Sequence, residues 1–308
     1  MNNNLYWSVY KNLEREVTEL ANLIHFDDQQ LNVYSIKISE LLLRTVVEIE
    51  SIVKEMYFLN GGTKADDNDL YFDTDCISLL ENKWKLSKKQ VLISAFNFYF
   101  TEDRNRILTP MNKANRRGTS SSDWQKSYQA IKHNRAKNLT KGNLKNLIRA
   151  MAGLYILNVY YKDTFYELEK DATGTNFDSS LGSTIFSIKI HVNSSIGINK
   201  DHEKNPDFEE CVYILKPTDK TRMEVQNALK TINEKTNERL NSIIIDEVKK
   251  QFSGLHVANQ EEMQEKLKTS VEKVRSENMI QVARENAHLL KKSFEDLRYE
   301  AVLNKHQF

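Results

Sequence analysis

Apolar residues recur at spacings of three and four through most of the first 165 residues, which is the periodicity of amphipathic α-helices. A first apolar stripe runs from Tyr6 to Ile24, and a more apolar one runs from about Val33 to Phe58. Asp123 is a suitable N-cap for a helix through the central stretch Trp124–Arg135. Further helices are predicted over 76–83, 87–100 and 144–161. This pattern predicts a helical bundle over residues 1–170.

The pattern changes after Asp171. Residues 184–192, TIFSIKIHV, alternate in polarity and are rich in β-branched side chains. Residues 211–215, CVYIL, can pair with them across a polar loop. We therefore expect a small β-hairpin or short sheet within a β-containing insertion at 171–220.

Two long helices with narrow apolar stripes and many charges are predicted to follow the insertion. The first begins at the capping box formed by Thr221 and Glu224 and ends near Phe252. The second runs from about Asn259 to Asn304. They predict a long helical hairpin or arm over 221–308, with packing on the first domain as the alternative. The expected fold is mainly α, a helical bundle followed by a small β element and a long C-terminal helical arm.

Composition supports a folded protein of about two domains. Of the 308 residues, 40% are hydrophobic and 28% are charged, which is typical of chains that bury a core. Cys76 and Cys211 give neither a disulfide framework nor a metal-binding spacing, and the acidic stretch 64–75 lacks the pattern of a calcium loop. No signal peptide and no membrane-spanning apolar run is visible. The expectation is a soluble cytoplasmic protein with no cofactor, no metal and no membrane contact.

Positive charge is concentrated in one segment. Between Arg104 and Ala150 there are twelve Lys or Arg residues and one acid, Asp123, while the rest of the chain is net acidic. A clustered positive field attracts polyanions. We expect RNA or another polyanion to bind here, through Arg104, Arg106, Arg116, Arg117, Lys126, Tyr128, Lys137 and Lys141.

The central stretch also contains a candidate catalytic group. On an uninterrupted helix, Arg135 shares the face of Trp124, Tyr128 and Ile131 and would be partly buried there. A buried cation needs a counter-charge, for which Glu48, with Arg44 nearby, or a bound phosphate is the candidate. The candidate catalytic residues are His133, Arg135, Lys132, Glu48 and Arg44.

Three segments carry a resemblance to a known family. They are the helix ELLLRTVVEIESIVKEMY with Arg44 and Glu48, the stretch YQAIKHNR with His133 and Arg135, and the small-residue helix LIRAMAGLYILNVYY. The first 165 residues resemble the HEPN superfamily of all-helical nucleotide-binding and ribonuclease domains. YQAIKHNR is similar to the K-H-x-R variant of bacterial, phage-defence-associated members. The C-terminal half resembles no family that we recognise.

The resemblance implies a bundle of four or five helices that forms a homodimer. It also implies metal-independent RNA cleavage at a dimer cleft, by a Lys/His/Arg group in an anti-phage, abortive-infection or toxin effector. Histidine can exchange a proton near neutral pH, and a guanidinium can hold phosphate oxygens. Active members usually place Arg before His, whereas here Arg135 follows His133.

Two other classes of function stay open. One is a non-catalytic module of the same fold that binds RNA, a nucleotide or a protein. The other is a structural interaction protein whose basic segment pairs with the acidic remainder of the chain. We also expect a homodimer through the small-residue helix around Ala150–Gly153, and a regulatory protein partner for the C-terminal helices.

Overall fold

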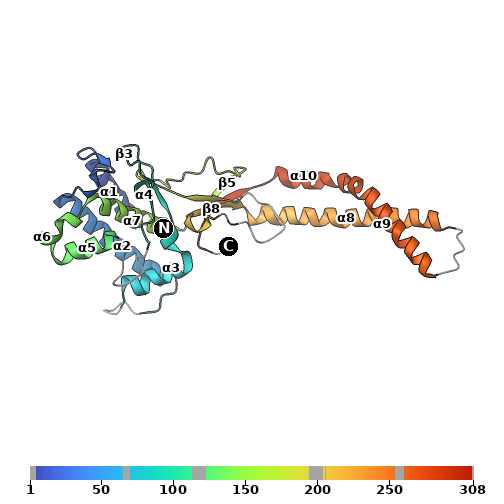
Figure 1. The fold of residues 1–308 in the computed structure, drawn as a ribbon, viewed down its shortest axis with the longest axis horizontal. Coiled ribbons are helices and arrows are strands. Elements are labelled where there is room, and N and C mark those ends of the chain that lie inside the picture. Colours follow the sequence, from blue (N-terminus) through green and yellow to red (C-terminus); the bar gives the residue numbers. More distant parts are fainter. Residues whose placement is uncertain are drawn as a thin grey trace.

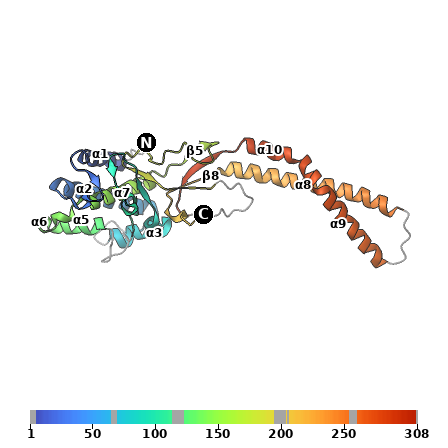
Figure 2. The same cartoon turned by 45° about the horizontal axis from the view of Figure 1, so that its top comes forward.

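The molecule is elongated, with a helical head at one end and a long helical arm projecting from it (Figures 1 and 2). The computed structural model describes residues 5–64, 70–112, 123–193, 204, 206–253 and 260–306. Most of these residues are helical and fewer lie in small sheets, so the predicted mainly α fold class is confirmed. No helix within the described ranges has the length and the hydropathy needed to cross a bilayer.

Two helices form the centre of the head. They are α2 (Ile36–Leu59) and α7 (Leu144–Lys162), which pack along each other. The helices α1 (Leu5–Leu20) and α5 (Asp123–His133) pack against this pair. The apolar stripes predicted for these helices are buried, because each helix contributes one face to a common core.

The small-residue stretch of α7 is used inside the protomer. Ala150, Ala152 and Gly153 are all buried, and a Cβ on Gly153 would lie 3.5 Å from Cδ1 of Ile49 in α2. The close helix approach that these residues allow is therefore intramolecular. This removes the stretch as a dimer surface, and dimerisation itself stays a prediction.

Residues 87–100 were predicted to be helical, and this is wrong. After the π-helical turn Phe72–Ile77 and α3 (Ser78–Trp84), this segment forms a 3-10 turn and two short strands. The strand β2 (Val91–Ile93) lies between β4 (Ile107–Leu108) and β6 (Phe186–Ile188). An apolar run of this length fits a strand or a helix, and only the distant partner strand decides between them.

Three short elements complete this side of the head. The strand β3 pairs in parallel with β1, and α4 precedes β4. Their bounds are Phe26–Asp27 for β1, Phe98–Tyr99 for β3 and Asp103–Arg106 for α4.

The alternating stretch 184–192 forms two strands in two different sheets. Its first half is β6, and its second half is β7 (Ile190–Val192), which pairs with β8 (Tyr213–Pro217). The pairing of β7 with β8 is parallel, so of the two predicted alternatives the hairpin is wrong and the short sheet is confirmed. Between them the chain runs through the single 3-10 turn Phe208–Glu210 that the structure describes there. A parallel pair needs such a crossover, whereas a hairpin turn produces an antiparallel pair.

The arm is an antiparallel pairing of one long helix with two shorter ones. α8 (Asp219–Phe252) is about 50 Å long, and α9 (Gln260–Glu285) and α10 (Ala287–Glu295) return along it (Figure 1). The N-cap of α8 is Thr218, whose side chain accepts a hydrogen bond from the backbone N–H of Thr221. The predicted cap, Thr221, instead accepts a hydrogen bond from the backbone N–H of Arg298.

The last segment of the chain returns to the head as a strand. It was predicted to be helical to Asn304, but the helix ends at Glu295 and β9 (Tyr299–Leu303) follows. Tyr299, Ala301 and Leu303 are buried with the period of two that a strand requires. β9 lies between β8 and β5 (Tyr166–Glu169), so the sheet order is β5-β9-β8-β7.

This sheet anchors the arm to the head. β8 leads directly into α8, and β9 receives the chain after α10, so the two feet of the arm are neighbouring antiparallel strands. Val212, Leu215 and Ala301 belong to the same hydrophobic core as α1, α2 and α7. Strands from 171–220 and from the end of the chain are therefore structural parts of the head.

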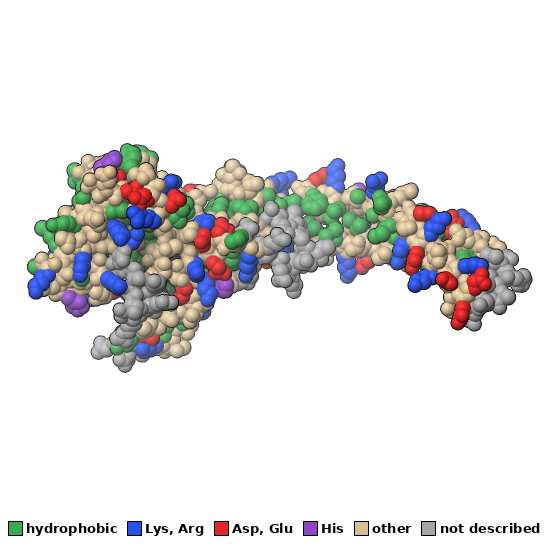
Figure 3. Space-filling view, viewed as in Figure 1, with side chains coloured by type: hydrophobic (Ala, Val, Ile, Leu, Met, Phe, Trp, Pro, Cys, Tyr) green, Lys and Arg blue, Asp and Glu red, His purple; other side chains and the backbone are tan. Residues whose placement is uncertain are grey.

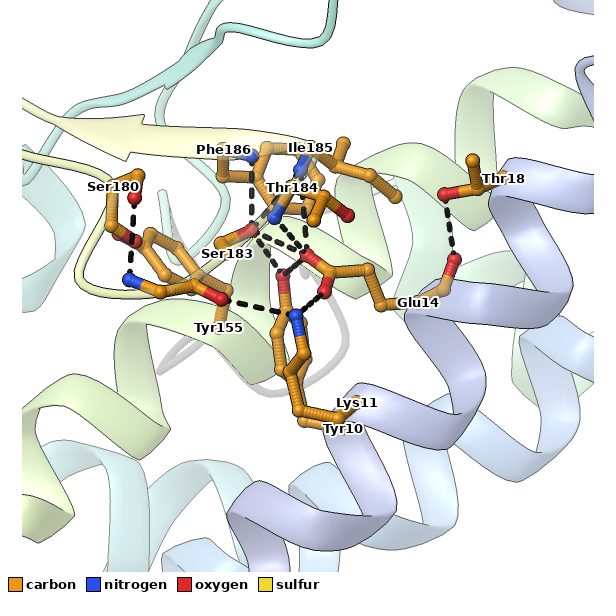
Figure 4. Close-up of polar contacts among 11 residues, drawn as sticks. Tyr10, Lys11, Glu14, Thr18, Tyr155, Ser180, Ser183, Thr184, Ile185 and Phe186 are labelled. Carbon is orange, nitrogen blue, oxygen red and sulfur yellow. Dashed lines mark hydrogen bonds and ion pairs between the residues drawn. The ribbon is translucent and has the colours of Figure 1, made fainter.

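A buried carboxylate ties α1 to the chain before β6 (Figure 4). Glu14 is 1% exposed, and its Oε1 accepts from the Tyr10 and Ser183 hydroxyls and from the backbone N–H of Thr184. Its other oxygen pairs with Lys11. Burial alone would raise the pKa of Glu14, but the hydrogen bonds from Lys11, Ser183 and Tyr10 outweigh it and hold the pKa below its ordinary value.

Candidate nucleic-acid interface

The central stretch forms an amphipathic helix, α5, whose apolar face is set into the head. Trp124, Tyr128 and Ile131 are buried, as the spacing predicts. The Trp124 indole N–H donates to the carbonyl of Pro110 at 2.9 Å. The Tyr128 hydroxyl donates to the Glu50 carboxylate in α2 at 3.1 Å. These contacts fix the orientation of α5 and leave its opposite face to solvent.

The helix ends at His133, before Arg135. Asn134 has φ −153° and is the N-cap of the short helix α6 (Arg135–Asn138), with its side chain accepting from the N–H of Lys137 at 3.1 Å. Arg135 is exposed. The prediction that Arg135 lies on the buried Trp124 face is therefore wrong, because one non-helical residue, Asn134, interrupts the helix on which it was based. An exposed guanidinium also needs no buried counter-charge.

Exposed cations gather on this end of the head, which is the end of the molecule away from the arm (Figures 1 and 3). We call this set the cationic tip; it comprises Lys126, Lys132, His133, Arg135, Lys137 and Lys141, all exposed. No acidic residue occurs in the sequence from 124 to 162. None of the six side chains forms an ion pair with another residue in the described ranges. The tip is therefore not neutralised by the acidic remainder of the chain, so far as the described residues show.

Glu48 and Arg44 lie on a different side of α2. Arg44 forms an ion pair with Glu16 of α1 at 2.6 Å. Both line a cavity of about 300 Å³ whose other walls are apolar side chains of α1 and α2. Burial raises the pKa of Glu48, and the charge of Arg44 opposes this rise. Neither residue faces α5.

The carboxylate of α2 that contacts α5 belongs to Glu50 and not to Glu48. Residues i and i+2 of an α-helix are about 200° apart around the helix axis, so these two glutamates point to opposite sides of α2. Burial raises the pKa of Glu50, while the hydrogen bond from Tyr128 and the charge of Lys132 lower it. Periodicity places Glu48 and Glu50 on different faces of α2, but only the packing of α5 shows which of the two faces Tyr128.

A cavity of about 450 Å³ opens beside the cationic tip. Its lining combines aromatic, amide and charged side chains: Glu50, Tyr71, Phe72, Asp73, Gln125, Lys126 and Gln129. Tyr128 does not line it, because its ring is buried under Lys132 and its hydroxyl is bonded to Glu50. Burial and the Glu50 carboxylate raise the pKa of Tyr128 to about 12. Tyr128, predicted to bind nucleic acid, is therefore a core residue.

The remaining predicted binding residues are separated from the tip in the sequence. Arg104 is exposed in α4 and forms an ion pair with Glu102, and Arg106 is exposed at the end of the same helix. The pairing with Glu102 leaves Arg104 a weaker candidate for phosphate. Arg116 and Arg117 lie outside the described residues.

Side chains able to hold a metal meet elsewhere, where the head joins the arm. Donor atoms of His191, Asp207 and Cys211 lie within 4.8 Å of one another. No short ligand motif in the sequence indicates this group, because fifteen residues lie between His191 and Asp207.

Comparisons of the chain with known protein families, with characterised proteins and with solved structures find no match. The function must therefore be argued from the site itself.

Proposed function

We propose that the cationic tip binds RNA, which makes the chain an RNA-binding module with a HEPN-like head. The observation that carries the proposal is a set of exposed cations without ion pairs in the described part of the chain. Exposed Lys and Arg side chains gain affinity for a polyanion by displacing its counterions, and cations already paired within the protein would gain less. The resemblance of YQAIKHNR to ribonuclease-type HEPN members favours RNA over other polyanions.

The cavity beside the tip suits an unstacked base. Proteins that read single-stranded RNA stack bases on aromatic rings and bond their edges with polar side chains. Phe72 brings an aromatic ring and Gln129 brings an amide to the lining of this cavity, beside Lys126. The acids Glu50 and Asp73 in the same lining would repel a phosphate, so the base and not the backbone is the part expected to enter.

Binding of labelled single-stranded RNA, followed by fluorescence anisotropy, tests this proposal. If the five Lys and Arg of the tip each neutralise one phosphate, affinity should fall roughly 100- to 500-fold between about 50 and 200 mM salt. The triple variant Lys132→Glu, Arg135→Glu, Lys137→Glu should bind about tenfold or more weakly.

The matched control places the same charge change on the arm. Lys220, Lys230 and Lys235 are exposed on α8, and changing all three to Glu should leave RNA affinity nearly unchanged. Equal losses in both triple variants would show only an effect of net charge and would overturn the assignment to the tip.

The second candidate function is metal-independent endoribonuclease activity, which one observation favours. His133 and Arg135 are both exposed on either side of the break at Asn134, so an acid–base group and a phosphate-binding group lie together at the surface. A surface position at the end of the molecule also leaves room for a second protomer to complete a cleft, as the resemblance implies. With such activity, the protein would act in the cell as an anti-phage defence or toxin effector.

Cleavage is tested by incubating the full chain with total RNA in EDTA. General acid–base catalysis contributes about a hundred- to ten thousandfold, so His133→Ala should abolish cleavage and leave RNA affinity in place. Cleavage that survives unchanged in His133→Ala would reject the catalytic proposal. RNA binding without any cleavage by the unaltered chain would leave the binding module as the function.

A further inference from the structure

Three ligating side chains converge where the head joins the arm. His191 lies in β7, and Asp207 and Cys211 flank the 3-10 turn that precedes β8. Their donor atoms are an imidazole nitrogen, a carboxylate oxygen and a thiol sulfur, all within 4.8 Å of one another. His191 and Cys211 are buried, and Asp207 is partly exposed, so the group has one side toward solvent.

The surrounding structure holds this group in place through the backbone. The N–H of Val212 donates to the carbonyl of Lys189 at 2.8 Å, which joins the approach to β8 to the start of β7. The buried Asn304 side chain donates to the carbonyls of Phe208 and Cys211 at 2.7 and 3.0 Å. The Cys211 thiol donates to the carbonyl of Asp207 at 3.4 Å. These bonds hold the backbone around the three residues in place.

We propose that His191, Asp207 and Cys211 form a binding site for a divalent transition-metal ion of the zinc type. The donor set decides the class of ion, because thiolate and imidazole suit zinc or cobalt, whereas magnesium and calcium take oxygen ligands. Three protein ligands leave a fourth tetrahedral position for water or a further group. On binding, the metal–sulfur bond forms as the Cys211 thiol releases its proton to solvent.

A neighbouring lysine supports a thiolate at this position. Lys89 is 0% exposed, and its Nζ has no hydrogen-bond partner among the described residues. Its charge interacts with Glu209 and with Cys211. A metal-bound thiolate would place negative charge and an acceptor near this buried ammonium, which a neutral thiol does not.

The acidic side chains near the three ligands also balance the positive charge that a bound ion would add. Lys189 bonds Asp207 at 3.3 Å and Glu210 at 2.6 Å, and the bond to Asp207 uses only one of its two carboxylate oxygens. The other oxygen stays available as a ligand. A bound ion would link β7 to the segment that enters β8, and so would stabilise the strand from which the arm begins. This site is independent of the cationic tip.

The test uses the full chain after treatment with a chelator and dialysis. One equivalent of Co²⁺ should give tetrahedral visible bands and a sulfur-to-cobalt charge-transfer band, both removed by Zn²⁺ and not by Mg²⁺. Cys211→Ser should remove the charge-transfer band, whereas Cys76→Ser, at the other buried cysteine, should retain it. Unaltered protein that takes up neither Co²⁺ nor Zn²⁺ at micromolar concentration would overturn the proposal.

A second variant covers the case in which Cys211→Ser does not fold. Asp207→Asn changes a partly exposed side chain and should leave the fold intact while weakening Co²⁺ binding roughly 100-fold or more. Asp219→Asn is the matched control, since Asp219 is exposed and also bonds a lysine, Lys216. Unchanged Co²⁺ affinity in Asp207→Asn, or a charge-transfer band that survives in Cys211→Ser, would show that the metal binds elsewhere.

Discussion

At the scale of single residues, buried charge is the dominant feature of the head. Glu14 is fully hydrogen-bonded, whereas Lys89 is equally buried and its ammonium has no hydrogen-bond partner in the described ranges. Removing these two charges should therefore have opposite effects on stability, because a buried charge stabilises a fold only when its bonds offset the loss of its hydration.

Glu14→Gln should lower the free energy of unfolding by about 2–3 kcal/mol, because donors around Oε1 lose a charged acceptor. The pKa of Glu14 lies below its ordinary 4.5, so the folded state binds fewer protons than the unfolded state in that range. The stabilisation is full above that value and is lost as pH falls through the folded pKa. Urea unfolding between neutral pH and pH 3 measures both effects.

The surface carboxylate Glu16 supplies the control for this prediction. It pairs with Lys37 and Arg44 in partly exposed positions, so Glu16→Gln should cost less than about 1 kcal/mol. Equal losses from the two variants would show that the Glu14 network contributes no more than surface ion pairs.

Lys89→Met should raise the free energy of unfolding of the chelator-treated protein by about 1–3 kcal/mol, because a similar volume is kept and a buried ammonium without a hydrogen bond is removed. Urea unfolding at pH 7 measures the change. Lys83→Met is the comparison, since Lys83 is exposed and should have little effect. A destabilised Lys89→Met variant would mean that the ammonium has a stabilising role that its surroundings do not show.

At the scale of elements, the break between α5 and α6 decides what the tip can do. Asn134 ends one helix and caps the next, which turns Arg135 away from the apolar face of α5. Without the break, the regular spacing from Trp124 would have placed the guanidinium in the core. One capping residue therefore separates a packing surface from the proposed RNA-binding surface.

Asn134→Ala should lower stability by about 1 kcal/mol and also weaken RNA binding, because the cap that orders α6 is lost. Asn143→Ala is the matched control. Asn143 caps α7 in the same way, with its side chain accepting from the N–H of Asn146, but α7 forms the core. It should lower stability similarly while RNA affinity, measured by anisotropy, is kept. An equal loss of affinity in both variants would contradict a specific role for the break.

At the scale of the whole molecule, the head depends on strands from both ends of the second half of the chain. β6, β8 and β9 complete the core that α1, α2 and α7 begin. The arm, in contrast, leaves and re-enters through one pair of neighbouring strands, with Pro217 opposite Tyr299. The boundary between the head and the arm therefore lies where β8 and β9 connect to the helices of the arm.

A fragment of residues 1–170 should fail to fold, because Val212, Tyr213 and Ala301 would be missing from its core. A chain in which a short turn replaces residues 219–297 should fold and should still bind RNA, because β8 and β9 would then form an ordinary hairpin. Circular dichroism melting distinguishes the two. A cooperative transition in the 1–170 fragment would restore the sequence-based division at residue 170.

The sequence by itself determined the helices of the head, the arm and the basic character of the tip. Local periodicity and capping specify long amphipathic helices, so α2, α7 and α8 were predicted to within a few residues. The identity of the buried face of α5 followed from the same periodicity.

Only the tertiary structure decided how the strands pair, that 91–93 and 299–303 are strands, which residue of α2 contacts α5, and the metal-ligand group. A three-residue strand such as β2 has no local signal of its own, because its stability comes from a partner almost one hundred residues away. The choice between Glu48 and Glu50 depended on which side of α2 receives α5. The meeting of His191 with Cys211 depended on the parallel pairing of β7 with β8, a long-range contact that no spacing along the chain encodes.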